Sequence, residues 1–452
     1  MFNIQDFGAA PNIEVLQTHA IQAAIDACHN TGGGIVTVPP GSYYISTIYL
    51  RSNVSLHLEN DAVLIGSHNL TDYPEISDLF IDAVGHVRGK CLIYGRDLIN
   101  SSITGNGTID GNGSAFKIDE SNRPLLVRYV NCHNISLSDI YLRNSAAWVV
   151  HLFRSENIQI HRVTINSHVN SNNDGVDIDS CKNVQISNCS IDTSDDAICI
   201  KSTDSKICED IIVTHCNLKS IWGALKIGTE TFGDIRNITF SNITIRDTFG
   251  GGLKIISMDG SRVENIIVDT ITMKNVSGQI FLRLGSRLRT YYKNLVARKP
   301  GTLKNITISN IDIHVIEEGY LLYGKYPRKA GIIATGIPGH LIDNLNFNNL
   351  NIIFPGDTNF KIPISYNVPE QEAEYPEFPM FHPLPSWGFF FRHINEITLR
   401  HITLKTENTD ARPPIFVDDV KNINISDTTI NNLPIDNQSQ LVINQSPLSK
   451  PL

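Results

Sequence analysis

Short runs of alternating hydrophobic and polar residues recur along most of the chain. The recurring unit starts with Asn or Asp and continues with two such runs, which a polar break separates. Its copies are NISLSDIYL from Asn134, NIQIHRVTI from Asn157, NVQISNCSI from Asn183, DIIVTHCNL from Asp210, NITFSNITI from Asn237, NIIVDTITM from Asn265, NITISNIDI from Asn305 and NINISDTTI from Asn422. Alternation with a period of two is typical of strands with one buried face. The chain is therefore predicted to be all-β.

The spacing of the copies predicts how these strands are connected. The first six copies follow one another at intervals of 23, 26, 27, 27 and 28 residues. Such intervals are too short for strand-helix-strand units or four-stranded propeller blades, and they suit one coil of a parallel β-helix. Coils would stack about 4.8 Å apart, and the repeated Asn is predicted to form a hydrogen-bonded ladder.

Other segments depart from the repeat. HAIQAAIDACHN, residues 19–30, is predicted to be a helix that ends at Gly32 to Gly34 and caps the open N-terminal edge, within a cap of about residues 1–35. Long inserts are predicted at residues 285–303, 316–341 and 355–387. Because no Pro/Ser/Gly-rich linker divides the chain, we expect one domain over residues 1–452.

Composition narrows the environment and the partners. The 41% of hydrophobic residues suffice for a large core, and the net charge of −9 argues against nucleic acid or a membrane as partner. No secretory signal is visible, so we expect a cytoplasmic protein, or a secreted one if a leader was removed. The eight cysteines are expected to be free, buried thiols. Nothing indicates the oligomeric state.

Candidate chemistry lies in NNDGVDIDSCKNVQISNCSIDTSDDAICIK, residues 172–201. Asp is depleted in strands and adjacent carboxylates repel, so Asp174 and the pair Asp195 and Asp196 indicate a function. Ionisable residues 12 to 18 positions after successive anchors are predicted to form one column: His151, Asp174, Asp195, Asp196, Lys226, Lys254 and Arg283. Each alone would be interpreted as an ordinary solvated residue.

These motifs resemble the polygalacturonase family, family 28 of the glycoside hydrolases, whose members are right-handed parallel β-helices. The resemblance covers most of the chain, from FNIQDFGA through ITGNGTIDGNG to LPSWGFFFRHINEITLRHI. The family's Asn-Thr-Asp motif falls on Asn172, Asn173 and Asp174, and its Asp-Asp pair on Asp195 and Asp196. This resemblance implies that the protein is an inverting glycosidase that cleaves the α-glycosidic bonds of pectin-derived oligosaccharides.

The resemblance also implies roles for the aspartates. Inversion needs one carboxylic acid to protonate the leaving oxygen and carboxylate base character to activate water. Asp195 would be the acid, and Asp174 with Asp196 would hold the water. Mutual repulsion is expected to raise at least one of their pKa values. Calcium binding is the alternative, but no Gly-Gly-x-Gly-x-Asp series is present, so we expect no metal and no cofactor.

Two departures from the family pattern concern the sugar beside the cleaved bond. Ala224 or a neighbour stands where the family has a histidine that supports the acid. Lys254 and Ile256 stand where it has an Arg and a Lys that bind a galacturonate carboxylate. Either this sugar is neutral, such as rhamnose, which is our preferred interpretation, or Arg283 with Lys226 supplies the charge.

Further residues are predicted to belong to the site. His151 resembles the Trp-x-x-His of exo-acting members and is predicted to hydrogen-bond a sugar, or else to be packed at the groove floor. Asn173 is predicted to bind substrate, and Lys201 and Glu230 are predicted to contact substrate or to brace the aspartates. Aromatic residues of the 355–387 insert would either stack on sugars and close one end of the groove, giving exo cleavage, or bury the insert.

The predicted function is exo cleavage of rhamnogalacturonan or galacturonan fragments. Its alternatives are an exo-polygalacturonase proper, a calcium-dependent pectate lyase and a non-catalytic carbohydrate-binding β-helix.

Overall fold

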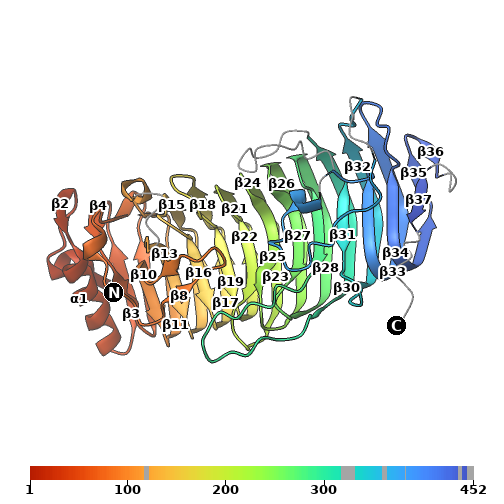
Figure 1. The fold of residues 1–452 in the computed structure, drawn as a ribbon. Coiled ribbons are helices and arrows are strands. Elements are labelled where there is room, and N and C mark those ends of the chain that lie inside the picture. The colour runs from red at the N-terminus through yellow and green to blue at the C-terminus, as the bar shows by residue number, and fades with distance from the viewer. Residues whose placement is uncertain (117–121, 317–330, 359–363, 382, 436–439, 445–452) are drawn as a thin grey trace. The chain divides into compact units, whose positions relative to one another are not determined.

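The computed structural model describes residues 1–116, 122–316, 331–358, 364–381, 383–435 and 440–444. Contacts divide the chain into two compact units. Unit 1 comprises Met1–Ile200 and Lys206–Leu218, and unit 2 comprises Lys201–Ser205 and Lys219–Leu452. Both consist of parallel strands in the right-handed β-helix fold (Figure 1), which confirms the predicted fold class. The expectation of one domain stays a prediction.

Unit 1 builds its coils from three short strands each, and equivalent strands of successive coils pair in parallel register. One series consists of β5 (Ile48–Tyr49), β10 (Cys91–Arg96), β13 (Leu125–Val130), β16 (Val150–Phe153) and β19 (Val176–Asp179). A second consists of β1 (Phe2–Asn3), β3 (Gly34–Val38), β6 (Val54–Leu58), β11 (Ile99–Thr104), β14 (His133–Ser138), β17 (Glu156–His161), β20 (Lys182–Ser187) and β23 (Cys208–Thr214). A third consists of β2 (Ile13–Leu16), β4 (Gly41–Ile45), β7 (Ala62–Gly66), β12 (Thr108–Asp110), β15 (Tyr141–Arg143), β18 (Thr164–Ser167) and β21 (Ser190–Thr193). Two more strands, β22 (Ile198–Ser202) and β24 (Asn217–Ser220), contain residues of both units.

The alternating residues of the repeat form the core of each coil. Ile135, Ile158, Val184 and Ile211 occupy equivalent positions on four paired strands and are at most 1% exposed. Burying a side chain of this size contributes about 1.5–3 kcal/mol. The hydrophobic positions of the repeat therefore supply the stacking energy between coils.

The predicted asparagine ladder is present. Asn134 donates its side-chain amide to Asn100, Asn157 to Asn134 and Asn183 to Asn157, over 3.0, 3.1 and 2.7 Å. Each of them has a positive φ between 52° and 57°. Asn tolerates this left-handed conformation better than other residues with a Cβ, which explains why it recurs at the corner. Unit 2 continues the pattern with Asn237, Asn265, Asn305 and Asn344.

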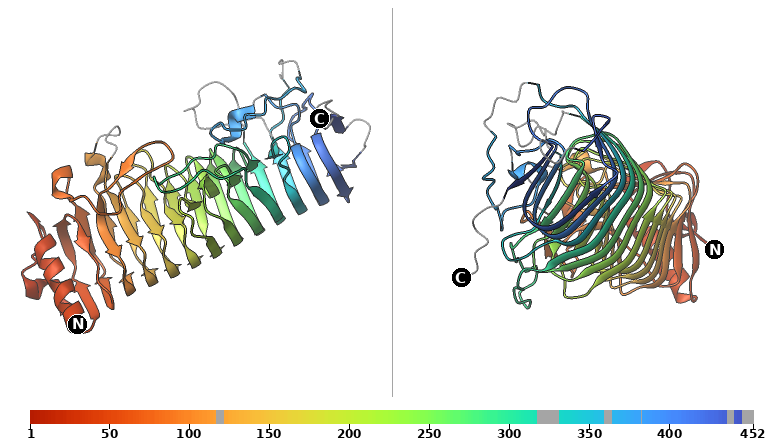
Figure 2. Two further views of the ribbon diagram at one scale, coloured as in Figure 1. Left: turned by 60° about the horizontal axis from the view of Figure 1, so that its bottom comes forward. Right: turned by 90° about the vertical axis from the view of Figure 1, so that its right-hand side faces the viewer.

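The N-terminal cap is the predicted helix. α1 (Thr18–Asn30) buries Ile21, Ala24, Ile25 and Cys28 against the first coil of unit 1 (Figure 2). The helix ends at Asn30, and in the turn after it Gly33 adopts φ +112°, where a Cβ would lie 2.3 Å from the carbonyl oxygen of Asn53. Only glycine fits at that close approach. The two-stranded antiparallel hairpin β8 (Phe80–Ile81) and β9 (Val87–Arg88) of unit 1 was not predicted.

Unit 2 has longer strands. Its shorter series consists of β25 (Gly223–Thr231), β27 (Gly251–Ser257), β29 (Ile280–Leu284) and β31 (Ile332–Thr335). Its longer series consists of β26 (Ile235–Thr248), β28 (Arg262–Val276), β30 (Thr302–Val315), β32 (Asp343–Phe354), β33 (Phe389–Thr406) and β34 (Ile415–Ser426). The last coil adds β35 (Thr429–Ile430), β36 (Leu433–Pro434) and β37 (Leu441–Asn444).

The inserts of unit 2 lie between these strands. Residues 285–301 connect β29 to β30, and residues 355–388 connect β32 to β33, close to the predicted bounds. Much of the insert predicted at 316–341 lies outside the described residues. Phe378, Phe381 and Leu384 of the last insert are at most 2% exposed and pack against the coils of unit 2. These residues bury the insert, which corresponds to the second role predicted for its aromatic side chains.

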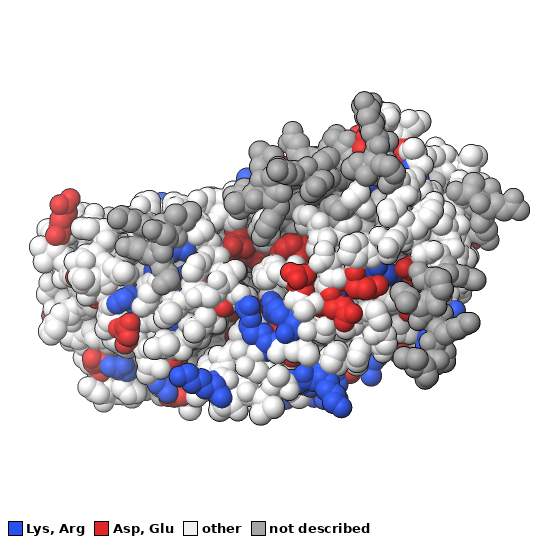
Figure 3. All heavy atoms as spheres, in the orientation of Figure 1, with Lys and Arg blue, Asp and Glu red and all other residues white. Residues whose placement is uncertain are grey.

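All eight cysteines are buried free thiols, as predicted. In the described part of the chain, no helix has the length and apolar character needed to cross a membrane. The face drawn in Figure 3 carries both acidic and basic side chains.

Candidate active site

Three aspartates of unit 1 lie together in consecutive coils. Asp174 precedes β19, and Asp195 and Asp196 precede β22. One carboxylate oxygen of each residue lies within 4.8 Å of the others. Asp174 and Asp196 are 4% and 2% exposed, whereas Asp195 is more accessible. The sequence therefore identified a real cluster.

The backbone explains why the aspartates approach. The Gly175 N–H donates to the Asp196 carbonyl over 2.9 Å, and the Val176 N–H donates to Ala197 over 3.0 Å. A Cβ at Gly175 would lie 2.4 Å from the Ala197 carbonyl oxygen. Gly175 thus permits the close contact of the two coils that sets Asp174 beside Asp196.

Asp195 is held by donors from its own coil and from the preceding one. Its Oδ1 accepts the Asp196 backbone N–H over 2.9 Å, and its Oδ2 accepts the Asn172 side-chain amide over 3.5 Å. The hydroxyl of Thr193 donates to the Asp195 carbonyl over 2.7 Å. The carboxyl group is therefore oriented while remaining accessible.

The prediction that Asn173 binds substrate needs correction. Asn173 is fully buried, and its amide group donates to the carbonyls of Ser145 and Ala147 over 2.8 and 2.9 Å. Its Oδ1 accepts the Asn170 N–H over 3.1 Å. Because both amide hydrogens bond the backbone, Asn173 braces the loop that carries Asp174 and presents no surface to a sugar.

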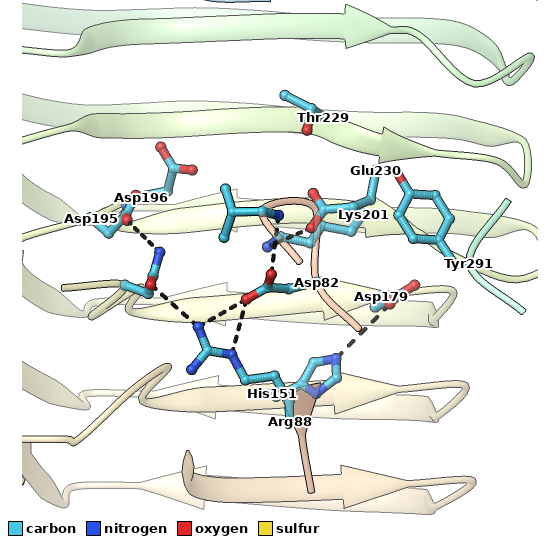
Figure 4. A network of polar contacts seen from close by, with 12 residues as sticks. Asp82, Arg88, His151, Asp179, Asp195, Asp196, Lys201, Thr229, Glu230 and Tyr291 are labelled. Carbon is cyan, nitrogen blue, oxygen red and sulfur yellow. Dashed lines mark hydrogen bonds and ion pairs between the residues drawn. The ribbon is translucent and has the colours of Figure 1, made fainter. Parts of the chain in front are cut away.

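The position of His151 does not agree with the first prediction, that it hydrogen-bonds a sugar. It is 1% exposed, and its ring lies 5.0 Å from that of Phe80 and 5.2 Å from that of Trp148. Its Nε2 lies 4.0 Å from an Asp179 carboxylate oxygen (Figure 4). The structure thus corresponds to the packed alternative, in which aromatic rings cover the histidine.

The hairpin β8–β9 is the part of the unit 1 site that the sequence analysis missed. Phe80 covers His151 and Trp148, and Arg88 lies directly opposite Phe80 on the other strand. The turn is closed by Asp82, whose Oδ1 accepts the N–H groups of Val84 and His86 over 3.1 and 2.9 Å. Strands of two residues are too short to show an alternating pattern. The turn-forming residues Asp82 and Gly85 between the two strands were the signal that could have indicated the hairpin.

The remaining predicted residues belong to unit 2. Lys201 and Glu230 are 3% and 4% exposed, and their charged groups lie 3.6 Å apart (Figure 4). They form a buried ion pair with each other, and their predicted contacts with substrate or with the aspartates stay predictions. Lys226 is 4% exposed on β25 and pairs in register with Lys254 on β27.

Lys254 has a protein partner for its charge. Its Nζ lies 2.7 Å from Oε2 of Glu377, which belongs to the 355–388 insert, and 5.0 Å from the centre of the Trp222 ring. The Trp222 Nε1–H donates to Oε1 of Glu377 over 3.2 Å. Since Lys254 is fully buried, this carboxylate already neutralises its charge.

Ile256 fills an apolar cluster of unit 2. It is fully buried together with Met258, Phe281 and Phe378. A lysine at this position would be placed in hydrophobic surroundings and would not point into a polar groove. The altered residue is therefore part of the packing that holds the insert.

Arg283 anchors the same insert. It is fully buried and donates to the carbonyls of Gly336, Glu370 and Gln371 over 2.8, 2.7 and 3.1 Å, and to the Thr335 hydroxyl. Burial, together with the like charge of Arg392, lowers the pKa of Arg283 to about 9. Contact with a substrate carboxylate would require Arg283 to give up these bonds, which corrects its predicted role.

A second insert of unit 2 is fixed by a network that the sequence analysis also missed. Fully buried Asp259 accepts hydrogen bonds from Arg287 and from the Tyr291 hydroxyl, the latter over 2.8 Å. Arg287 further donates to the Thr229 carbonyl over 2.6 Å. This network ties residues 285–301 to β25 and to the turn that follows β27.

The predicted single column is interrupted in both units. His151 pairs in register with Asp177, not Asp174, and Arg283 pairs with Ile256, not Lys254. Lys226 and Lys254 align in register as expected, and the aspartates of two consecutive coils also lie together. In unit 1, His151 and Asp174 have equal offsets but do not align, because the loop before β19 has eight residues and the loop before β16 has six.

The aspartate cluster has two chemical uses. A partly exposed carboxyl beside two buried ones can serve acid and base catalysis. Carboxylate oxygens are also the ligands that Ca²⁺ and Mg²⁺ prefer. A test of function must therefore control for divalent cations.

Comparison with known proteins finds one matching family and several relatives. The model of glycosyl hydrolases family 28 matches residues 79–322. A "Probable polygalacturonase" of Vitis vinifera is 30% identical over 317 residues, and an "Exo-poly-alpha-D-galacturonosidase" of Dickeya chrysanthemi is 26% identical over 340. A "Probable rhamnogalacturonase A" of Aspergillus oryzae is 26% identical over 243. These matches cover 64%, 62% and 53% of this chain and 64%, 56% and 47% of the relatives' own lengths.

Two solved structures have the same fold. An exopolygalacturonase from Thermotoga maritima superposes with a TM-score of 0.64 at 23% identity, over 78% of this chain and 86% of its own. A family 28 exopolygalacturonase from Yersinia enterocolitica gives 0.66 at 18% identity, over 100% and 79%.

Proposed function

Because this chain belongs to family 28 of the glycosyl hydrolases, we propose that it hydrolyses α-glycosidic bonds in pectin-derived oligosaccharides. The proposed substrates are rhamnogalacturonan or galacturonan fragments, which are cleaved from one end. The relatives include enzymes named for both substrates and one named for exo action.

The observation that carries the proposal is the aspartate cluster of unit 1. Asp195 is the proposed general acid because it is the most accessible of the three and is oriented by two donors. Asp174 and Asp196 are the proposed carboxylates that hold and activate water. Positioned acid and base groups contribute about 10²–10⁴-fold each to the rate.

Inversion of the anomeric centre is part of the proposal. Inverting enzymes keep acid and base roughly 6.5–9.5 Å apart, to leave room for water. The nearest oxygens of the three aspartates lie within 4.8 Å, which is shorter than that range. Inversion is therefore proposed from the resemblance of the motifs, and the product's stereochemistry is its test.

A neutral sugar beside the cleaved bond is the finer proposal. Lys254 takes the place of a carboxylate-binding cation, yet Glu377 neutralises it at 2.7 Å and Ile256 is buried in an apolar cluster. A sugar carboxylate would have to displace Glu377. These contacts favour rhamnogalacturonan fragments over oligogalacturonides.

The test is turnover after dialysis against a chelator. Purified protein is assayed on rhamnogalacturonan oligomers and on oligogalacturonides, for new reducing ends and for ultraviolet absorbance, before and after calcium is returned. Asp195→Asn, purified in parallel, controls for contaminating enzymes. The proposal expects reducing ends without new absorbance, unaffected by the chelator, and higher kcat/KM on rhamnogalacturonan.

The other outcomes identify the alternatives. Calcium-dependent absorbance would indicate a lyase, and binding without turnover would indicate a carbohydrate-binding β-helix. A higher kcat/KM on oligogalacturonides would contradict only the proposal of a neutral sugar beside the cleaved bond and would leave the proposed hydrolysis intact.

A further inference from the structure

A buried arginine of the β8–β9 hairpin is connected to the aspartate cluster of unit 1. Arg88 is fully buried, and its Nε and Nη2 lie 3.0 and 2.8 Å from Oδ2 of Asp82 (Figure 4). Its guanidinium also lies 5.9 Å from the centre of the Trp148 ring. An arginine held on one side by a carboxylate has a fixed plane, and so its remaining N–H groups have fixed directions.

One of those directions leads to Asn172. Nη2 of Arg88 donates to Oδ1 of Asn172 over 3.3 Å, and Nη2 of the fully buried Arg123 donates to the same oxygen over 3.5 Å. Two cationic donors can face only the oxygen of an amide. They therefore decide which way the amide of Asn172 points and direct its NH₂ group to the opposite side.

The NH₂ group of Asn172 faces Asp195. Nδ2 donates to Oδ2 of Asp195 over 3.5 Å, while the Asp196 backbone N–H occupies Oδ1 over 2.9 Å. The first contact is long, as is common for catalytic hydrogen bonds before substrate binds. If the amide were reversed, its oxygen would face a carboxylate oxygen and repel it.

We propose that Arg88 is a positioning residue for this reaction and acts on Asp195 through the amide of Asn172. The inference rests on the proposed function, because it takes Asp195 as the general acid. Arg88 touches neither the substrate nor the reacting atoms. Its effect is to keep the Asn172 amide in the one orientation that holds Oδ2 of Asp195 in place.

The experiment compares Arg88→Lys, Asn172→Ala and the double variant on the better of the two oligosaccharides. A lysine is a point charge that cannot hold Asp82 and Asn172 together. We expect kcat to fall about 10- to 100-fold in each single variant with KM changed less than about twofold, as for a misplaced catalytic group. The double variant should lose no more than Asn172→Ala alone.

The matched control is Arg143→Lys. Arg143 also lies in unit 1 and pairs with an aspartate, Asp110, at 2.7 Å, but it is bonded to none of the residues of this chain of contacts. Its kcat should equal that of the unchanged protein. Melting temperatures of all variants separate a loss of folded protein from a loss of kcat, and Asn172→Ala carries the test if Arg88→Lys does not fold.

Two results would overturn the inference. An unchanged kcat in Arg88→Lys, or losses that add in the double variant, would contradict it while leaving the proposed function intact. Absence of turnover by the unchanged protein on both oligosaccharides would remove the proposed function and the inference together.

Discussion

Among single residues, Asp195 is the one whose surroundings match a proton donor. It is accessible, whereas Asp174 and Asp196 are almost completely buried. A group that protonates a leaving oxygen has to reach the substrate itself, whereas a carboxylate that activates water acts through that water. Exposure therefore separates the proposed roles within the cluster.

Replacing Asp195 by Asn tests this assignment at the residue scale. The amide keeps the shape of the carboxyl but has no acidic proton, so kcat should fall by about two to four orders of magnitude with little change in melting temperature or ligand affinity. The control is Asp192→Asn, since Asp192 lies in β21 and pairs with His168 at 2.6 Å. Full activity of purified Asp195→Asn would refute the role.

The product's configuration tests the other two aspartates. If Asp174 and Asp196 activate water on the face opposite the leaving group, the first-formed sugar has the inverted configuration. Proton NMR within the first minutes of turnover measures the anomeric configuration of the product before mutarotation changes it. A retained configuration would assign one of them as a nucleophile.

The sequence predicted the role of a residue only where a motif contains the groups that are proposed to react. Asp174, Asp195 and Asp196 were found because Asp is depleted in strand-rich segments and adjacent carboxylates repel each other. The packing of His151 was not decided, because Phe80, which covers it, is 71 residues away in a segment without a pattern. When a residue is buried by side chains from a distant loop, the sequence around that residue does not indicate the burial.

At the scale of elements, the ladder at the coil corners combines two stabilising contributions. Asn157 donates to Asn134 and accepts from Asn183, and it does so at φ +56°. Alanine would lose both hydrogen bonds and would also be strained at positive φ, whereas glycine would lose only the bonds.

We therefore expect Asn157→Ala to destabilise the protein more than Asn157→Gly. The left-handed conformation costs a residue with a Cβ about 1–2 kcal/mol, and each lost hydrogen bond about 1 kcal/mol. Urea unfolding followed by circular dichroism measures both variants. Equal losses would mean that the conformation contributes nothing to the preference for Asn.

The anchoring of the last insert predicts a pH dependence. His393 of β33 bonds Asp419 over 2.6 Å and Glu370 of the insert over 3.1 Å. Burial alone would lower the pKa of His393, but the hydrogen bonds to Glu370 and Asp419 outweigh it and raise the pKa. The stabilisation is then complete below about pH 6.5, the ordinary pKa of histidine, and is lost as the pH rises through the raised value.

His393→Gln removes this charge. The difference in melting temperature between the unchanged protein and the variant should be largest near about pH 6 and should shrink as the pH rises above the raised pKa. The matched control is His401→Gln on the same strand, whose pairing with Asp427 at 3.5 Å is exposed. A difference that is constant with pH would contradict the predicted linkage.

Repeated elements were predictable, and single ones were not. The coils and the ladder followed from a pattern that occurs many times, and α1 followed from its amphipathic spacing and terminal glycines. The alignment of ionisable residues between coils failed, since it depends on loop lengths that vary from coil to coil. Counting residues locates a strand within its coil only after the loops are known.

For the whole molecule, the net charge of −9 opposes an anionic substrate. Repulsion between like charges acts over the Debye length, which falls from about 30 Å at 0.01 M salt to about 8 Å at 0.15 M. We expect kcat/KM on oligogalacturonides to rise over this range. Methyl-esterified oligomers, which lack the charges, serve as the control and should change little. A fall with salt would show that local cations dominate the encounter.

The asparagine ladder also constrains how a protein of this kind can change its length over generations. Each rung joins equivalent residues one coil apart, so duplicating or deleting a complete coil returns every asparagine to an equivalent neighbour. Adding one residue inside a strand would instead turn every following side chain to the opposite face. Descendants of such a chain are expected to gain and lose whole coils and to collect small insertions in the loops, where intervals of 23 to 28 residues already coexist.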